Sequence, residues 1–174
     1  MQIIYSFNLS IEDYCKNIYF LDFPEFTSCP ICKDKVNLIK HGFYYRNAIN
    51  SDNSAYRLAI RRLVCPHCDK TISLLPDFLM PYFQSTVNRI INLLSNLLAN
   101  KLKKFIHLTY FYKLRFIKNL NGIISFFRFS GVFVPIPNKI DEKLLFFINK
   151  IKEFSTNSFS KLYIFKFNTC FLSK

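Results

Sequence analysis

The sequence lacks tryptophan and has only three glycines in 174 residues. It contains no glycine-rich phosphate-binding loop and no grouping of Ser, His and Asp, so nucleotide-binding and triad-hydrolase classes are not indicated. Acidic residues are also few, 11 in all, and none lies between residues 78 and 140. A two-metal nuclease or transposase centre needs several converging carboxylates. The sequence therefore predicts a protein that is not an enzyme.

Long apolar runs are missing as well. No stretch reaches 18 uninterrupted apolar residues, and the best candidate, GIISFFRFSGVFVPIP, is interrupted by Arg128 and two prolines. The first residues lack the basic region and the small-residue cleavage site of a secretory signal peptide. We therefore expect no membrane span and a cytoplasmic location, where structural disulfides are rare.

Positive charge is what the sequence has in excess, with a net charge of +13. Residues 85–131 hold eight Lys or Arg and no acid. A segment of this kind favours a polyanionic partner, and nucleic acid is the commonest one. The simpler alternative is a solvated basic surface without a specific partner.

Hydrophobic periodicity predicts an α+β chain in three parts. Residues 1–84 are expected to form a zinc-ribbon domain. Residues 85–131 carry apolar side chains at helical spacing and predict a helix-turn-helix-like segment. In its second helix the pattern continues toward residue 127, with Asn121-Gly122 as a candidate end. Residues 132–174 are predicted as a linker, an amphipathic helix and a tail, and the tail KLYIFKFNTCFLSK, residues 161–174, is either a strand or disordered.

Two β-rich segments in the first part predict a hairpin. NLIKHGFYYR and YRLAIRRLV are β-branched, aromatic and basic, and the polar segment NAINSDNSA separates them. Before this hairpin, Ser10 is expected to cap a short helix, because Asp13 follows three residues later. After it, TISLLPDFLMPYF is expected to be extended, since Pro76 and Pro81 block a helix.

Four cysteines form two Cys-Pro-x-Cys pairs, Cys29/Cys32 and Cys65/Cys68. Each such turn presents two thiolates to one point, and four sulfurs complete a tetrahedron around Zn²⁺. A tetrahedron closed in this way is structural rather than catalytic, and it contributes on the order of 10 kcal/mol to folding. An iron–sulfur cluster and a pair of redox disulfides are the alternatives, and His67 is a candidate to replace a cysteine ligand.

Basic residues of the hairpin and of the second predicted helix are the candidate nucleic-acid contacts. Long cations beside aromatic residues suit phosphate contact. In a helix-turn-helix the second helix enters the major groove. The competing interpretations are a strand edge protected by charge and a helix too buried to reach a groove. The candidates are Lys40, Arg46, Arg57, Arg61, Arg62, Lys104, Lys113, Arg115 and Lys118.

The cysteine pairs, together with KHGFYYR and RRLVCPHCDKTISLLPDFLMPY, resemble the zinc-ribbon heads of bacterial insertion-sequence transposases. More closely, the chain resembles small transposase-associated bacterial proteins that share a domain of unknown function. The resemblance covers residues 1–130 and implies DNA binding without strand transfer, with the four cysteines at the zinc positions. One departure is Asp69, which stands where a glycine usually follows the second cysteine pair.

Three functions follow as expectations. The first is a zinc-dependent DNA-binding protein resembling a transposase head that lacks its catalytic body, with DNA as its partner and no small-molecule substrate. The second is a protein–protein adaptor for a transposase or another nucleic-acid enzyme. The third is a peripheral membrane protein that uses basic, Phe-rich helices. The third ranks last, because it gives the ribbon no purpose.

Overall fold

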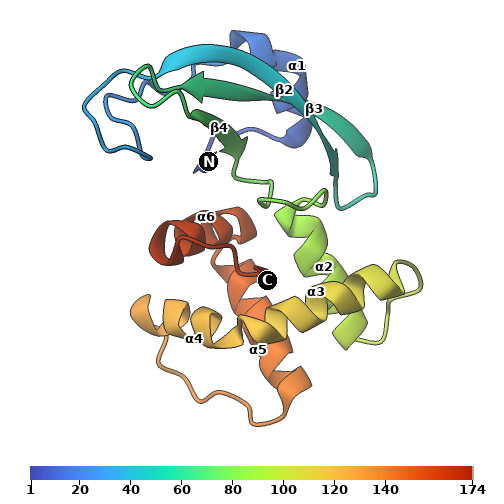
Figure 1. Cartoon of the computed structure of the whole chain (residues 1–174). Helices are drawn as coiled ribbons and strands as arrows, with labels where there is room; N and C mark the ends of the chain where they lie inside the picture. Colours follow the sequence, from blue (N-terminus) through green and yellow to red (C-terminus); the bar gives the residue numbers. More distant parts are fainter. Residues whose placement is uncertain (174) are drawn as a thin grey trace. The chain divides into compact units, whose positions relative to one another are not determined.

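The computed structural model describes residues 1–173, which form an α+β fold with a four-stranded sheet and six α-helices, and this confirms the predicted class. Two compact units divide the chain, the first ending at Gln84 and the second beginning at Ser85 (Figure 1). The sheet belongs to the first unit, and helices α2 to α6 belong to the second. None of the helices within the described residues has both the length and the apolar character that crossing a bilayer requires.

A mixed sheet with strand order β1-β4-β3-β2 forms the first unit. β2 (Ile39–Ile49) pairs antiparallel with β3 (Ala55–Val64), which pairs antiparallel with β4 (Thr71–Pro76). β1 (Gln2–Tyr5) runs parallel to β4. The predicted hairpin with two cysteine turns is therefore one part of a larger sheet, and the first unit is not a simple zinc-ribbon hairpin. The segment expected only to be extended becomes an inner strand, because β1 pairs with its other edge.

The hairpin formed by β2 and β3 is the predicted one. In its turn the carboxylate of Asp52 accepts hydrogen bonds from the backbone N–H and the hydroxyl of Ser54. Asn53 takes the left-handed conformation, with φ of 70°, which asparagine tolerates in turns. Gly42, with φ of 69°, lies where the pairing register shifts after Lys40. A glycine allows this bulge to form without backbone strain.

One short helix, α1 (Ile11–Asn17), is continued by the 3₁₀ turn η1 (Ile18–Phe20). Its predicted cap is confirmed, since the Ser10 hydroxyl accepts a hydrogen bond of 3.0 Å from the backbone N–H of Asp13. An oxygen at this position satisfies one of the free N–H groups of the first helical turn. The cap fixes where α1 begins and thereby which of its side chains face the core.

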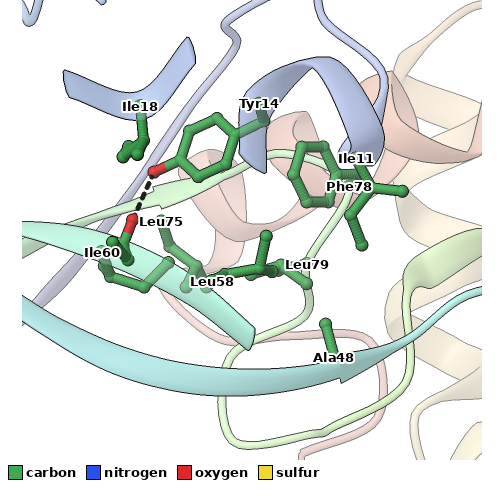
Figure 2. Close-up of a cluster of buried hydrophobic side chains, with 10 residues drawn as sticks. Ile11, Tyr14, Ile18, Ala48, Leu58, Ile60, Leu75, Phe78 and Leu79 are labelled. Carbon is green, nitrogen blue, oxygen red and sulfur yellow. Dashed lines mark hydrogen bonds between the residues drawn. The ribbon is translucent and has the colours of Figure 1, made fainter. Parts of the chain in front are cut away.

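Figure 2 shows the core of the first unit, with Tyr14 of α1 at its centre. Tyr14 is fully buried, and its hydroxyl donates a hydrogen bond of 3.0 Å to the carbonyl of Ala59 on β3. The polar end of a buried ring is thus satisfied by the sheet. Buried apolar residues complete the cluster: Ile11, Ile18, Ala48, Leu58, Ile60, Leu75, Phe78 and Leu79.

Helices α2 (Val87–Leu98) and α3 (Ile106–Lys118) confirm the two helical patterns predicted after Ser85. The hydroxyl of Thr86 caps α2 by accepting a hydrogen bond of 3.2 Å from the backbone N–H of Arg89. Residues 99–105 join the two helices, a connection longer than the three or four residues of a standard helix-turn-helix. The geometry of the pair therefore differs from that motif.

The second predicted helix is divided in two. α3 ends at Lys118, and α4 spans Leu120–Phe129, so the break precedes the Asn-Gly pair that was its candidate end. At the break the side-chain amide of Asn119 donates a hydrogen bond of 2.9 Å to the carbonyl of Arg115. Gly122 lies inside α4, where a Cβ atom would overlap the hydroxyl of Tyr163. The missing side chain at Gly122 thus leaves room for the Tyr163 hydroxyl of α6.

Two more helices follow, α5 (Ile140–Glu153), which was predicted, and α6 (Thr156–Phe167), which was not. The expectation of a strand or disorder for the tail is wrong over residues 161–167, which belong to α6. Phe159 and Tyr163 of this helix are buried, with ring centroids 5.0 and 6.1 Å from that of Phe126 on α4. Aromatic packing thus stabilises a helix whose own sequence pattern is weak.

We predict that Tyr14→Phe lowers the free energy of unfolding of the first unit by about 1–3 kcal/mol, because the buried carbonyl of Ala59 loses its donor. Tyr19→Phe is the matched control, since this tyrosine is 64% exposed and its hydroxyl contacts only the exposed Tyr45 hydroxyl, at 3.2 Å. It should change stability by no more than about 0.5 kcal/mol. Urea unfolding at a fixed metal concentration measures both, and equal effects would contradict the prediction.

Candidate metal centre

Both Cys-Pro-x-Cys turns lie at the same end of the β2–β3 hairpin. The first turn precedes β2, and the second joins β3 to β4. Their proximity follows from the strand register, since Ile39 at the start of β2 pairs with Val64 at the end of β3. The hairpin therefore brings the two cysteine pairs together in space, although 32 residues separate them in the sequence.

Four sulfur atoms lie within 4.8 Å of one another at this end. The Sγ atoms of Cys29 and Cys68 are 3.9 Å apart, and those of Cys32 and Cys65 are 3.8 Å apart. In a tetrahedral zinc–thiolate site with bonds of about 2.3 Å, neighbouring sulfurs lie about 3.8 Å apart. All four cysteines are free thiols, so they are spaced as ligands of one metal ion and not joined as disulfides.

The two turns repeat the same backbone geometry. The N–H of Lys33 donates to the carbonyl of Cys29 at 2.9 Å, and the N–H of Asp69 donates to the carbonyl of Cys65 at 3.0 Å. Lys33 and Asp69 both take the left-handed conformation, with φ of 67° and 53°. Asp69 thus adopts the backbone conformation that glycine usually supplies, and the departure from the resembled pattern leaves the turn intact.

Burial and hydrogen bonding shift the pKa values of Cys29 and Cys32 in opposite directions. Burial raises the pKa of Cys29, but the backbone N–H groups of Cys32 and Ile31 and the neighbouring thiols outweigh it and bring the pKa to about 6. The backbone N–H of Asp34 lowers the pKa of Cys32, but the Asp34 carboxylate and burial outweigh it and raise that pKa above its ordinary value. A thiolate is the form that binds metal, so Cys29 is ready as a ligand near neutral pH.

His67 lies beside the four sulfurs and is not one of their group. Its Nδ1 atom is 2.6 Å from a carboxylate oxygen of Asp34, which links the second cysteine turn to the first. Its ligand atoms also come close to Cys32, so these three residues form a second group of potential metal ligands. Within residues 1–173, no other group of three or more His, Cys, Asp or Glu brings its ligand atoms together in this way.

Two of the basic residues predicted to contact nucleic acid in the hairpin make contacts within the fold. The guanidinium of Arg46 donates to two backbone carbonyls, one of them that of Met80 at 2.6 Å, and burial lowers its pKa. The guanidinium of Arg61 lies between two rings, 4.0 Å from the centroid of Phe43 and 4.6 Å from that of Phe23. Neither guanidinium points freely into solvent.

Two of the predicted contacts on α3 are likewise engaged inside the second unit. Lys113 forms an ion pair of 2.6 Å with Asp141 of α5. Arg115 donates to the carbonyl of Leu172 at 3.1 Å and lies over the ring of Phe111, 4.4 Å from its centroid. A phosphate contact by either residue requires these interactions to break.

Exposed cations are the remaining candidates. Lys40 and Arg57 of the hairpin and Lys104 and Lys118 of the second unit are exposed, and Arg62 is half-buried. The sequence-based set missed exposed Lys101 and Lys103, which share the α2–α3 connection with Lys104. Their signal was present in the run KLKK, whose four residues include three lysines and no acid.

Positive charge is divided very unequally between the two units. The unit that begins at Ser85 holds 15 Lys and Arg against three acids, a net charge of +12. The first unit holds nine against eight, a net charge of +1. Nearly all of the excess charge therefore belongs to the second unit and not to the unit that contains the four clustered cysteines.

The solvent-facing side of α3 is mostly apolar. Ile106, Tyr110, Phe111 and Leu114 are all exposed, and Leu114 reaches 67%. His107 and Lys118 are the polar members of this side. A helix that reads base edges presents mainly hydrogen-bonding side chains, so the exposed side of α3 is not typical of a recognition helix.

Comparison with protein families finds one match, to the family described as Domain of unknown function (DUF6431), over residues 29–105. These are 77 of the 174 residues, from the first of the four clustered cysteines to the residue before α3. The match includes all four clustered cysteines and the lysines of the α2–α3 connection, and its description names no activity, metal or partner. Searches of curated proteins and of solved structures gave no significant match.

We predict that Cys65→Ser removes the bound metal from the purified chain, from one ion per chain to nearly none, because three sulfurs no longer enclose it. Cys15→Ser is the matched control, since it changes a free cysteine of the same unit outside the group of four. Elemental analysis and circular dichroism measure metal content and folding. Equal loss of metal in both variants, or retention in Cys65→Ser, would contradict the assignment of the ligands.

Proposed function

We propose that the chain is a zinc-dependent, non-catalytic DNA-binding protein that resembles the head of a transposase without its catalytic body. One structural Zn²⁺ orders the first unit, and the second unit provides most of the charge that attracts DNA. The observation that carries the proposal is the net charge of +12 on the helical unit, whereas the unit with the four cysteines is nearly neutral. A polyanion is the partner that such a charge favours.

Zinc is the metal that the four cysteines suit best. Four thiolates at tetrahedral spacing are its common structural ligand set, and they leave no vertex open for a substrate. The site is expected to contribute on the order of 10 kcal/mol to folding, since the unfolded chain does not preform it. Free thiols throughout the described residues are also what a reducing compartment maintains, which supports a cytoplasmic location.

DNA contact is assigned chiefly to the α2–α3 connection. Its three lysines are exposed and lie within four consecutive residues. No acidic residue occurs between positions 78 and 140 to neutralise them. Lysines of this kind bind phosphates and release counterions, which gives affinity without sequence readout. Lys40 and Arg57 of the hairpin are exposed and add contacts from the first unit.

The proposal gives the carboxylates no catalytic role. Several carboxylates each interact with one other side chain. Glu12 accepts a hydrogen bond from Tyr56, Asp77 accepts one from Ser6, and Asp141 forms an ion pair with Lys113. No three of them converge within the described residues. A two-metal centre for strand transfer requires such convergence.

A protein–protein adaptor is the second candidate, and the apolar side of α3 favours it. Four exposed apolar or aromatic residues on one helix suit a partner protein better than a phosphate backbone. The partner in this version is a transposase or another nucleic-acid enzyme, and the lysines serve the encounter with a complex that contains nucleic acid.

We predict that replacing Lys101, Lys103 and Lys104 by Gln weakens duplex DNA binding and reduces the slope of log affinity against log salt by up to about 3, since each phosphate contact contributes about 0.9. The matched control replaces three other lysines of the same unit, Lys139, Lys150 and Lys152, which contact Glu142, Glu153 and Ser95. Fluorescence anisotropy over a salt series measures both slopes. An equal effect of both triple variants would contradict a specific site, and affinity independent of salt would overturn the proposal.

Leu114→Glu separates the two candidates. The change places a charge on the apolar side of α3 without touching the connection lysines. If the chain is the proposed DNA-binding protein, Leu114→Glu lowers affinity for duplex DNA by less than the triple Lys→Gln variant does. If it is an adaptor, no DNA fragment binds at low salt, and Leu114→Glu abolishes capture of a purified transposase.

A further inference from the structure

The second group of potential ligands, Cys32, Asp34 and His67, lies against the outside of the four sulfurs. Its three ligand atoms, one sulfur, one carboxylate oxygen and one imidazole nitrogen, all lie within 4.8 Å of one another. The side chain of His67 is 65% exposed and that of Asp34 is 45% exposed, whereas Cys32 is half-buried. The group is therefore open to solvent, and water can complete a coordination shell.

Two elements of the fold bring these residues together. Cys32 and Asp34 end the first cysteine turn, and His67 lies inside the second. The contact between Asp34 and His67, at 2.6 Å, already spans the two turns. Both turns are fixed at the end of the hairpin by the strand register, so the three ligands are brought together by the same feature that gathers the four cysteines.

Electrostatics favour a cation at this position. A divalent ion held by four thiolates carries a net charge of −2, and the carboxylate of Asp34 adds another negative charge. Among the ion pairs formed by the described residues, that of Asp34 is with His67, and no Lys or Arg neutralises the carboxylate. A thiolate of an anionic metal centre also retains lone pairs, so the Sγ of Cys32 is able to bridge two ions.

Only a small movement is needed to admit an ion. Nitrogen and oxygen ligands of one tetrahedral ion with bonds of about 2.0–2.1 Å lie about 3.3 Å apart. The Asp34–His67 contact must therefore widen by somewhat less than 1 Å from its present 2.6 Å. Both side chains are substantially exposed, so rotation at the surface supplies this change without repacking the core.

We infer that this chain binds a second divalent transition-metal ion through the Sγ of Cys32, the carboxylate of Asp34 and the Nδ1 of His67, with water as the remaining ligand. Cys32 bridges this ion to the one held by the four cysteines. Zinc, cobalt and cadmium suit such a mixed sulfur, nitrogen and oxygen set, whereas magnesium and calcium prefer oxygen ligands alone. The second ion binds more weakly than the first, because it has fewer protein ligands and an open shell.

Equilibrium dialysis of the metal-free full chain against Cd²⁺ at fixed pH tests this inference, with Co²⁺ absorption as a second readout of ligand type. All proteins carry Cys15→Ser, which removes the other partly accessible thiol. We expect two ions per chain, and a second Co²⁺ spectrum with weaker sulfur-to-metal bands than the first. Asp34→Asn and His67→Asn should each keep the first ion and weaken binding of the second by at least about tenfold.

His107→Asn is the matched control, since it removes an exposed histidine of the second unit and should leave two ions bound. One ion per chain in the parent protein would overturn the second site and leave the first intact. Two ions with unchanged affinity in both Asp34→Asn and His67→Asn would also overturn it. No bound ion at all would overturn the four-cysteine site itself, and with it the zinc part of the proposed function.

Discussion

The first unit depends on four sulfur atoms meeting at the end of one hairpin. Residues 21–38, which carry the first cysteine turn, contain no helix or strand, so hydrogen bonds of regular structure do not hold them. Leu21 and Phe23 pack against the cluster around Tyr14, and Cys29 belongs to a smaller cluster that includes Cys65, Leu63, Ile72 and Leu74. This cluster has five buried members, half as many as the one around Tyr14. A metal ion bound at the four sulfurs would stabilise the end of the sheet where the apolar core is smallest.

Features set by short stretches of sequence were predictable. The Ser10 cap, the polar turn at Asp52 and the start of α2 each depend on residues within four positions of one another, and the structure has all three. The clustering of the cysteines was predictable for a different reason. Two matched turns flank two β-rich segments, and antiparallel pairing of those segments necessarily brings the turns together. Local patterns were therefore sufficient for the candidate metal centre.

Features that depend on distant partners were not predictable from the same sequence. β1 joins β4 across about 70 residues, and neither strand carries a sign of the other. Helix α6 forms because Phe159 and Tyr163 find aromatic partners on α4. The roles of Arg46 and Arg61 were missed for the same reason. An arginine whose guanidinium binds carbonyls or stacks between rings cannot be distinguished in the sequence from one that is free to bind a phosphate.

The division of charge constrains what zinc can do for DNA binding. Metal binding at the four cysteines would order a unit with a net charge of +1, whereas the lysines proposed to attract phosphates belong to a unit of +12 that contains none of the four cysteines. A dependence of affinity on zinc must therefore act through contacts of the first unit, such as Lys40 and Arg57, and not through the total charge. Each ordered contact adds to both affinity and salt slope, so zinc removal would lower the slope by about 0.9 for every phosphate contact that the first unit makes. The change in slope on metal removal thus counts those contacts directly.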